Sequence, residues 1–146
     1  MKKLSALFLT LCLCLSLSAC SNKSGAKEIS PGVVEVDGCR VEIYGYYERA
    51  QTTTFAGFVY IKFTNNSGES CSMSDKVEIR AFQNGTECND YYSAFPLFSV
   101  DSDDDVLNGV TAETGSAFKV KKGVPVLVQI VVDGKVISEK TVKSSK

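Results

Sequence analysis

The sequence predicts an all-β fold, an antiparallel β-sandwich that follows a cleaved lipoprotein signal peptide. Apolar and polar residues alternate with a period of two in several short runs, which is typical of strands with one buried face. Asp-Gly pairs separate two pairs of such runs, at Asp37-Gly38 and Asp133-Gly134, and this dipeptide favours two-residue hairpins. No internal repeat of about 20–50 residues is visible, which argues against a solenoid or propeller.

The first twenty residues have the pattern of a bacterial lipoprotein signal. Lys2 and Lys3 precede an apolar run over residues 4–17, and Leu17-Ser18-Ala19-Cys20 forms a lipobox. A membrane-spanning helix, the alternative interpretation, needs about 20 apolar residues, and this run is shorter. We therefore expect residues 1–19 to be removed, Cys20 to be diacylated, and the protein to be anchored at the extracytoplasmic face of the bacterial membrane.

The rest of the chain divides at a Pro-Gly pair. Residues 20–32 are small, polar and charged and end in Pro31-Gly32, which is typical of a flexible tether. Residues 33–146 are long enough for one domain with its own core. The expected organisation is thus a signal peptide over 1–19, a lipidated tether over 20–32 and a single sandwich domain over 33–146.

Composition and charge narrow the functional classes. Loss of Lys2 and Lys3 leaves fourteen basic residues against seventeen acidic ones, so nucleic acid is not an expected partner. The chain contains no histidine, the usual general base and a frequent metal ligand. We expect a protein that is not an enzyme and that needs no cofactor.

Individual strands are expected as follows. Val33–Val36 and Cys39–Ile43 flank the first hairpin turn, with Gly45 and Tyr47 continuing the inward face. Phe58–Thr64 is the clearest core strand, because Val59, Ile61 and Phe63 share one face. The segment from Asp101 to Thr114 lacks periodicity and is expected to be an irregular loop before a short strand over Ala117–Val120. The last expected strands are Val124–Val132 and Lys135–Val142.

Two strand-and-turn motifs resemble a known family. Phe58–Ser67 ends in Thr-Asn-Asn-Ser, and Ile79–Gly85 ends in Phe-Gln-Asn-Gly. These residues resemble a family of small bacterial lipoproteins and secreted proteins of unknown function. The domains of that family resemble telokin-like immunoglobulin sandwiches, including a mycobacterial secreted antigen. The resemblance covers roughly Val41 to Val142. It implies an immunoglobulin-like (telokin-like) sandwich and no catalytic residues. The Asn-Asn and Gln-Asn-Gly positions of the two motifs are expected to serve turns.

Three cysteines remain beyond the anchor: Cys39, Cys71 and Cys88. An extracytoplasmic compartment permits disulfides. Cys71 and Cys88 bracket a strand and are the preferred candidate pair, and three free thiols packed as small apolar residues are the alternative.

The acidic stretch around Asp103 is a candidate metal site. Asp101, Asp103 and Asp105 would supply the oxygen ligands that Ca²⁺ prefers. An EF-hand is excluded because Val106 and Ala112 stand where its glycine and glutamate belong. The alternative is a solvated acidic loop.

Paired tyrosines supply a candidate binding surface. Adjacent strand residues point to opposite faces, so one member of each pair should be exposed. Tyr46, Tyr91 and Tyr92 are the candidates, with sandwich packing as the alternative. The functional expectation is a non-catalytic module for an unknown protein or cell-envelope partner, and a carbohydrate- or peptidoglycan-binding module is the alternative.

Overall fold

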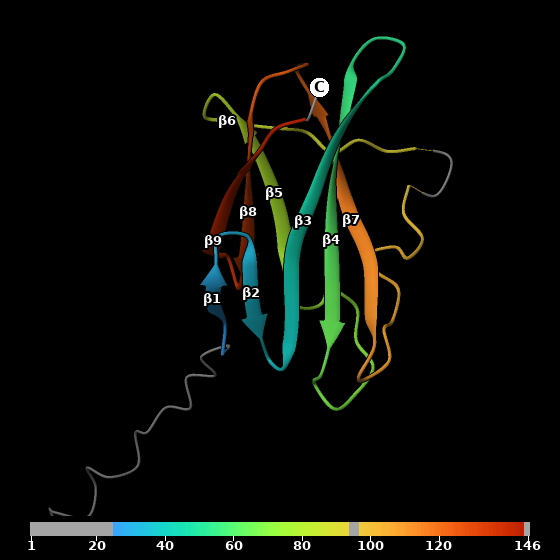
Figure 1. Ribbon diagram of the computed structural model, residues 1–146, viewed down its shortest axis with the longest axis vertical. Helices are drawn as coiled ribbons and strands as arrows, with labels where there is room; N and C mark the ends of the chain where they lie inside the picture. Colours follow the sequence, from blue (N-terminus) through green and yellow to red (C-terminus); the bar gives the residue numbers. More distant parts are fainter. Residues whose placement is uncertain (1–24, 94–96, 145–146) are drawn as a thin grey trace, which may run out of the picture.

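The computed structural model describes residues 25–93 and 97–144, which form two antiparallel sheets packed face to face (Figure 1). The five-stranded sheet has the order β1 (Lys27–Ser30), β2 (Val33–Val36), β3 (Cys39–Ala50), β4 (Phe55–Asn65) and β7 (Thr111–Val120). The four-stranded sheet has the order β6 (Thr86–Glu87), β5 (Glu78–Gln83), β8 (Val126–Val132) and β9 (Lys135–Val142). The predicted all-β sandwich is confirmed. The signal peptide and Cys20 lie outside the described residues, among which no helix is long and apolar enough to cross a membrane.

Short turns set the register of three hairpins. Each has two consecutive residues with positive φ, as a type I′ turn requires. The pairs are Asp37 (47°) with Gly38 (78°), Asn84 (50°) with Gly85 (77°), and Asp133 (49°) with Gly134 (74°). The two Asp-Gly hairpins expected from the sequence are therefore present, and the Asn-Gly pair turns the chain between β5 and β6.

The core fills the space between the two sheets. Its fully buried members are mainly β-branched side chains, which pack well on pleated surfaces. They include Val34, Val41, Ile43, Val59, Ile61, Phe63, Val126, Val128 and Ile130.

A β-bulge in β3 reverses the faces of the tyrosine pair. The pairing of β3 with β4 shifts by one residue between Ile43 and Gly45, so Tyr44 is the extra residue. Beyond this point Tyr46 packs against the core and Tyr47 is 52% exposed. The expected inward position of Tyr47 is wrong, because a strict period of two cannot register an inserted residue.

The strand β1 corrects the predicted domain boundary. Lys27–Ser30 pairs with β2, so the sandwich begins at Lys27, within the segment expected to be a flexible tether. All four residues are exposed, and the segment therefore carries no apolar alternation to predict it.

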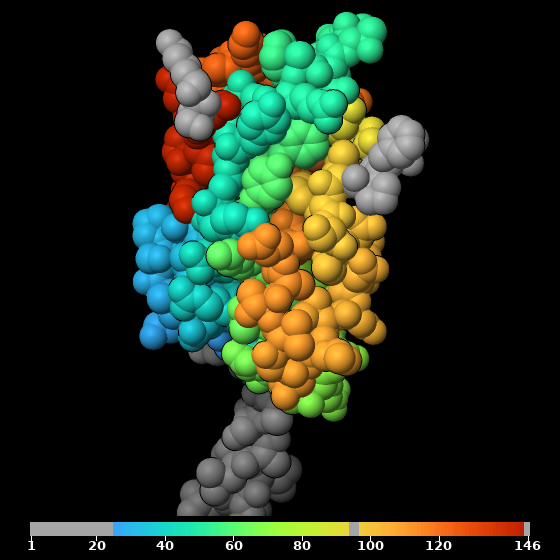
Figure 2. Space-filling model, turned by 45° about the vertical axis from the view of Figure 1, so that its right-hand side comes forward, coloured from blue at the N-terminus to red at the C-terminus, as the bar shows by residue number. Residues whose placement is uncertain are grey.

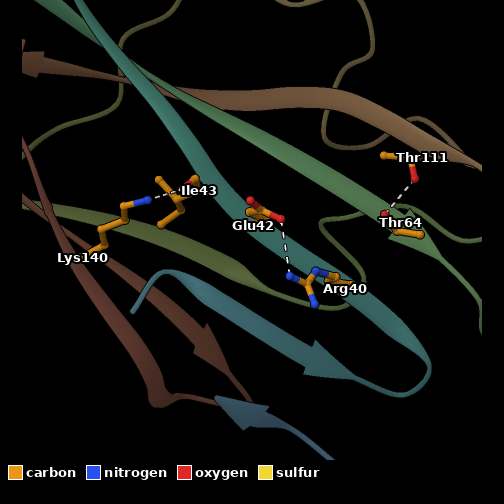
Figure 3. A network of polar contacts seen from close by, with 6 residues as sticks. All are labelled: Arg40, Glu42, Ile43, Thr64, Thr111 and Lys140. Atoms are coloured by element: carbon orange, nitrogen blue, oxygen red, sulfur yellow. Dashed lines mark hydrogen bonds and ion pairs between the residues drawn. The ribbon is translucent and has the colours of Figure 1, made fainter. Parts of the chain in front are cut away.

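Side chains of β9 join β1–β3 to the second sheet. The Ser138 hydroxyl accepts a hydrogen bond from the Gly32 N–H at 2.8 Å and donates one to the Glu28 carboxylate at 2.7 Å. Lys140 Nζ donates to the Ile43 carbonyl at 2.5 Å, beside the bulge (Figure 3). These contacts close one side of the sandwich.

Strand β7 is longer than the sequence indicates. It begins at Thr111 and pairs with β4 as far as Val120, where only Ala117–Val120 was expected. The Thr111 and Thr64 hydroxyls lie 2.8 Å apart across the two strands (Figure 3). The first half of β7 is rich in small and polar residues, which hides the strand from an analysis of periodicity.

Candidate binding cleft beside strand β7

A second, smaller apolar cluster lies on the outer face of the five-stranded sheet. Phe58 and Ala117 are buried there under the chain that follows β6. The Phe58 ring lies edge-on to Tyr91 and Phe98, with centroids 6.3 and 6.4 Å away, and Tyr60 lies 5.7 Å from Phe98. Figure 2 shows this yellow and gold segment alongside β4 and β7. It covers apolar residues that would otherwise be exposed on an outer sheet face.

Backbone hydrogen bonds fix the start of this segment to the edge of β7. The Tyr91 N–H donates to the Ala117 carbonyl at 2.8 Å, and the Lys119 N–H donates to the Asn89 carbonyl at 2.7 Å. Asp90 and Phe118 form an isolated bridge between these bonds. The segment thus extends the sheet briefly before it crosses the face.

A cleft of about 660 Å³ lies between this segment and β7, with Ile79 of β5 on its far side. Its aromatic residues are Tyr91, Tyr92, Phe98 and Phe118. Its acidic groups are Asp90, Asp101, Asp103 and Asp104, and none of the described residues lining it is Lys or Arg. Its volume falls in the range of about 300–1,000 Å³ that is usual for ligand sites.

Two of the three predicted tyrosines reach this cleft. Tyr92 is 82% exposed, and its hydroxyl donates to the Asp90 carboxylate at 3.2 Å. That hydrogen bond raises the pKa of Tyr92. Tyr46 faces the interior instead, where burial raises its pKa, so its predicted place on the binding surface is wrong. The bulge at Tyr44 is the cause.

The acidic loop is a hydrogen-bonded turn. The Asp104 carboxylate accepts the Asp101 N–H at 2.9 Å, and the Asp104 N–H donates to the Asp101 carbonyl at 3.1 Å. Among the described residues, no three acidic or cysteine side chains are grouped so that they could hold a metal ion. The structure therefore does not group Asp101, Asp103 and Asp105 as metal ligands, and the loop uses the carboxylate of the intervening Asp104 to close its own backbone.

The predicted cysteine pair is also wrong. All three described cysteines are free thiols, and Cys71 lies beside Cys39, with 3.6 Å between the two sulfur atoms. Cys88 lies at the other end of the sandwich, just before the Asp90–Phe118 bridge. Spacing along the chain could not reveal this, because Cys39 and Cys71 meet only when β3 and the loop after β4 pack together.

The fold and the family are defined by comparison with known proteins. A model of a domain of unknown function, DUF5067, matches residues 18–131 of the chain. The chain belongs to this family. The sequence predicts a family without an assigned function, and the DUF5067 match agrees with that prediction. No curated protein sequence matches the chain significantly.

Two solved structures resemble the DUF5067 domain. A predicted lipoprotein from Staphylococcus aureus aligns over 80% of this chain and 90% of its own, with 14% identity and a TM-score of 0.61. At that identity the likeness shows a shared fold. A predicted lipoprotein from Bacillus subtilis aligns over 78% of this chain and 38% of its own, with 15% identity and a TM-score of 0.48.

The two motifs of the DUF5067 domain each contain one buried amide that supports a distant loop. Asn65 Nδ2 donates to the carbonyls of Glu69 and Val106, both at 2.7 Å. Gln83 Oε1 accepts the Lys121 N–H at 2.7 Å, and its Nε2 donates to the Val124 carbonyl at 2.9 Å. These amides bond to backbone groups in distant loops. Val106 is 41 residues from Asn65, and Lys121 and Val124 are 38 and 41 residues from Gln83. Both amides therefore support the backbone, as expected for the Asn-Asn and Gln-Asn-Gly positions, but the loops they support lie beyond the adjacent turns.

Proposed function

We propose that this protein is a lipid-anchored, non-catalytic binding module at the extracytoplasmic face of the bacterial membrane. Its cleft beside β7 would take a basic segment of a protein partner. The observation that supports this best is the chemistry of the cleft, which combines four aromatic residues with four aspartates and has no basic residue among its described lining.

Charge favours a basic partner. The region after the signal peptide is acidic overall, and four aspartates line one cleft. Such a surface attracts cations and speeds encounter with a basic segment. The rings of Tyr91, Tyr92 and Phe98 can pack against the aliphatic stems of Lys and Arg and contact their charges through cation–π interactions.

The segment between the predicted lipid anchor and the first strand is short. The lipobox places the lipid on Cys20, and β1 begins at Lys27. Seven residues reach at most about 25 Å, so the domain would stay close to the membrane. Lys27 pairs with Glu35, near the turn at Asp37, and this end of the sandwich would therefore face the lipid. The S. aureus protein with the same fold is itself described as a predicted lipoprotein.

A non-catalytic role follows from the side chains available. The chain has no histidine to act as a general base. The four aspartates that line the cleft are all exposed to solvent, and none of them is enclosed by apolar side chains as a catalytic acid or base usually is.

Photo-crosslinking would test the binding role in cells. A photoreactive amino acid at position 92 should crosslink to a protein through a Lys- or Arg-rich peptide, identified by mass spectrometry. The same group at position 47, another exposed tyrosine outside the cleft, is the matched control. Asp103→Asn should weaken the crosslink at position 92, and added salt should weaken it further. Equal crosslinking from both positions would contradict the proposal.

A carbohydrate or peptidoglycan ligand is the second candidate. Exposed Tyr92 beside the Asp90 carboxylate offers a stacking surface with a hydrogen-bond acceptor next to it. In the same experiment, recovery of muropeptides and not of protein from position 92 would favour this candidate. Fatty-acid labelling of the wild-type protein but not of Cys20→Ala tests the anchor independently.

A further inference from the structure

We propose that Cys39 and Cys71 form a disulfide bond in the mature protein, and that this bond ties the loop after β4 to the start of β3. The proposal rests on the extracytoplasmic location proposed above, because only an oxidising compartment maintains such a bond. It differs from the pairing that the sequence suggests, since Cys88 takes no part in it.

The two sulfur atoms already lie side by side. Cys39 Sγ and Cys71 Sγ are 3.6 Å apart, and the residues are only 1% and 8% exposed. A side-chain adjustment of about 1.5 Å would bring them to the bonding distance of about 2.05 Å.

The backbone on both sides of the pair is held in place. Cys39 is the first residue of β3, where it pairs with Val36 on one side and Asn65 on the other. Cys71 exchanges two backbone hydrogen bonds with Val106, at 3.2 and 3.0 Å. The sheet and the bridge therefore bring the two residues close together, and only their side chains need to adjust to form the bond.

The thiols are shielded in the folded, reduced protein. Burial, and then the hydrogen bond with Cys71, raise the pKa of Cys39 to about 11. Thiolate is the reactive form, so the folded reduced protein should exchange slowly. We expect the bond to form while the chain folds and to resist reduction once it is buried.

The oxidation is an ordinary thiol–disulfide exchange. One cysteine thiolate attacks a disulfide of an oxidant, such as oxidised glutathione or a thiol oxidoreductase, and releases the first thiol of the oxidant. The second cysteine then attacks the mixed disulfide, which forms the Cys39–Cys71 bond and releases the second thiol. The two cysteines together lose two protons and two electrons, and the oxidant disulfide becomes two thiols.

A tryptic digest can distinguish the possible pairings, because each cysteine lies on its own peptide. Cleavage at the Lys and Arg residues places Cys39 on residues 28–40, Cys71 on residues 63–76 and Cys88 on residues 81–119. The full-length protein would be isolated from membranes after acid quenching and alkylation, then digested without reduction. We expect peptide 28–40 linked to 63–76, with Cys88 alkylated. Alkylation of both Cys39 and Cys71, or a link between 63–76 and 81–119, would overturn the proposal.

Fatty-acid labelling of the same sample tests whether the protein is lipidated. A labelled protein with alkylated Cys39 and Cys71 contradicts the disulfide and leaves the proposed location intact. A linked peptide from an unlabelled protein supports the disulfide and contradicts the lipid anchor.

Stability measurements give a second test. A reductant should lower the Tm of the wild-type protein by roughly 10 °C. Cys88→Ala is the matched control and should keep this dependence, whereas Cys39→Ala and Cys71→Ala should lose it. A reductant effect that persists in Cys71→Ala would count against the proposal. The peptide map of the wild-type protein remains decisive even where a variant fails to fold.

Discussion

Replacing Asn65 by Ala should be among the most damaging single substitutions in this domain. The side chain is fully buried and bonds to three backbone groups: the carbonyls of Glu69 and Val106 and the N–H of Ser67 at 2.9 Å. Each buried group left without a partner costs about 1–3 kcal/mol, and the groups nearer the surface recover part of this from water. We expect a total loss of about 3–5 kcal/mol in the free energy of unfolding.

Urea unfolding of the full-length protein, followed by circular dichroism, measures this loss. The neighbouring Asn66 is exposed, so Asn66→Ala is the matched control and should change stability by less than about 0.5 kcal/mol. Asn65→Asp keeps the acceptor but points a carboxylate at two carbonyls, which raises its pKa in the folded state. That variant should therefore regain stability as the pH falls. A cost below about 1 kcal/mol for Asn65→Ala would refute the role assigned to this amide.

Three further substitutions test other parts of the structure. Gly115→Ala should destabilise the domain by about 1–3 kcal/mol, because the new methyl group would overlap the Val59 carbonyl and the Phe98 ring. Thermal unfolding measures this loss, and an unchanged Tm would contradict it. Gln83→Ala should cost about 2–4 kcal/mol by freeing the backbone of residues 121–124, and faster hydrogen exchange at those residues would locate the effect. Burial raises the pKa of Cys39 from 9.0 to about 11, so above pH 9 the reduced folded protein binds more protons than the unfolded chain does. Its stability should fall as the pH rises from 9 to 11, and Cys39→Ala should reduce that slope.

Much of the sandwich is predictable from local sequence, because its core strands and hairpins obey local rules. The strand around Val59, Ile61 and Phe63 alternates strictly, and both Asp-Gly turns have the backbone geometry that this dipeptide favours. These features need no knowledge of the rest of the chain.

The errors arise where a distant part of the chain decides the structure. Strand β1 has no buried residue of its own and exists because β2 offers it an edge and Ser138 bonds to Glu28. Tyr46 and Tyr47 exchange faces because of one inserted residue in β3. Neither cause leaves a periodic signal in the local sequence.

The candidate site is predictable only in part for the same reason. Tyr92 and Tyr91 could be named as a paired aromatic signal, but the cleft exists only because Tyr91 bonds to Ala117 and Phe98 packs on Gly115. The Cys39–Cys71 approach likewise depends on the register of β3 against β4. A residue type suggests a chemistry, whereas tertiary packing selects its neighbours.

The two sides of the sandwich explain why the cleft lies where it does. One side is closed by Ser138 and Lys140, whereas the side between β7 and β5 is crossed by an irregular segment. That segment is fixed near its start by the Asp90–Phe118 bridge, and Val106 fixes its end to Cys71. The proposed disulfide would connect the Val106 end of the segment to the start of β3 through Cys71.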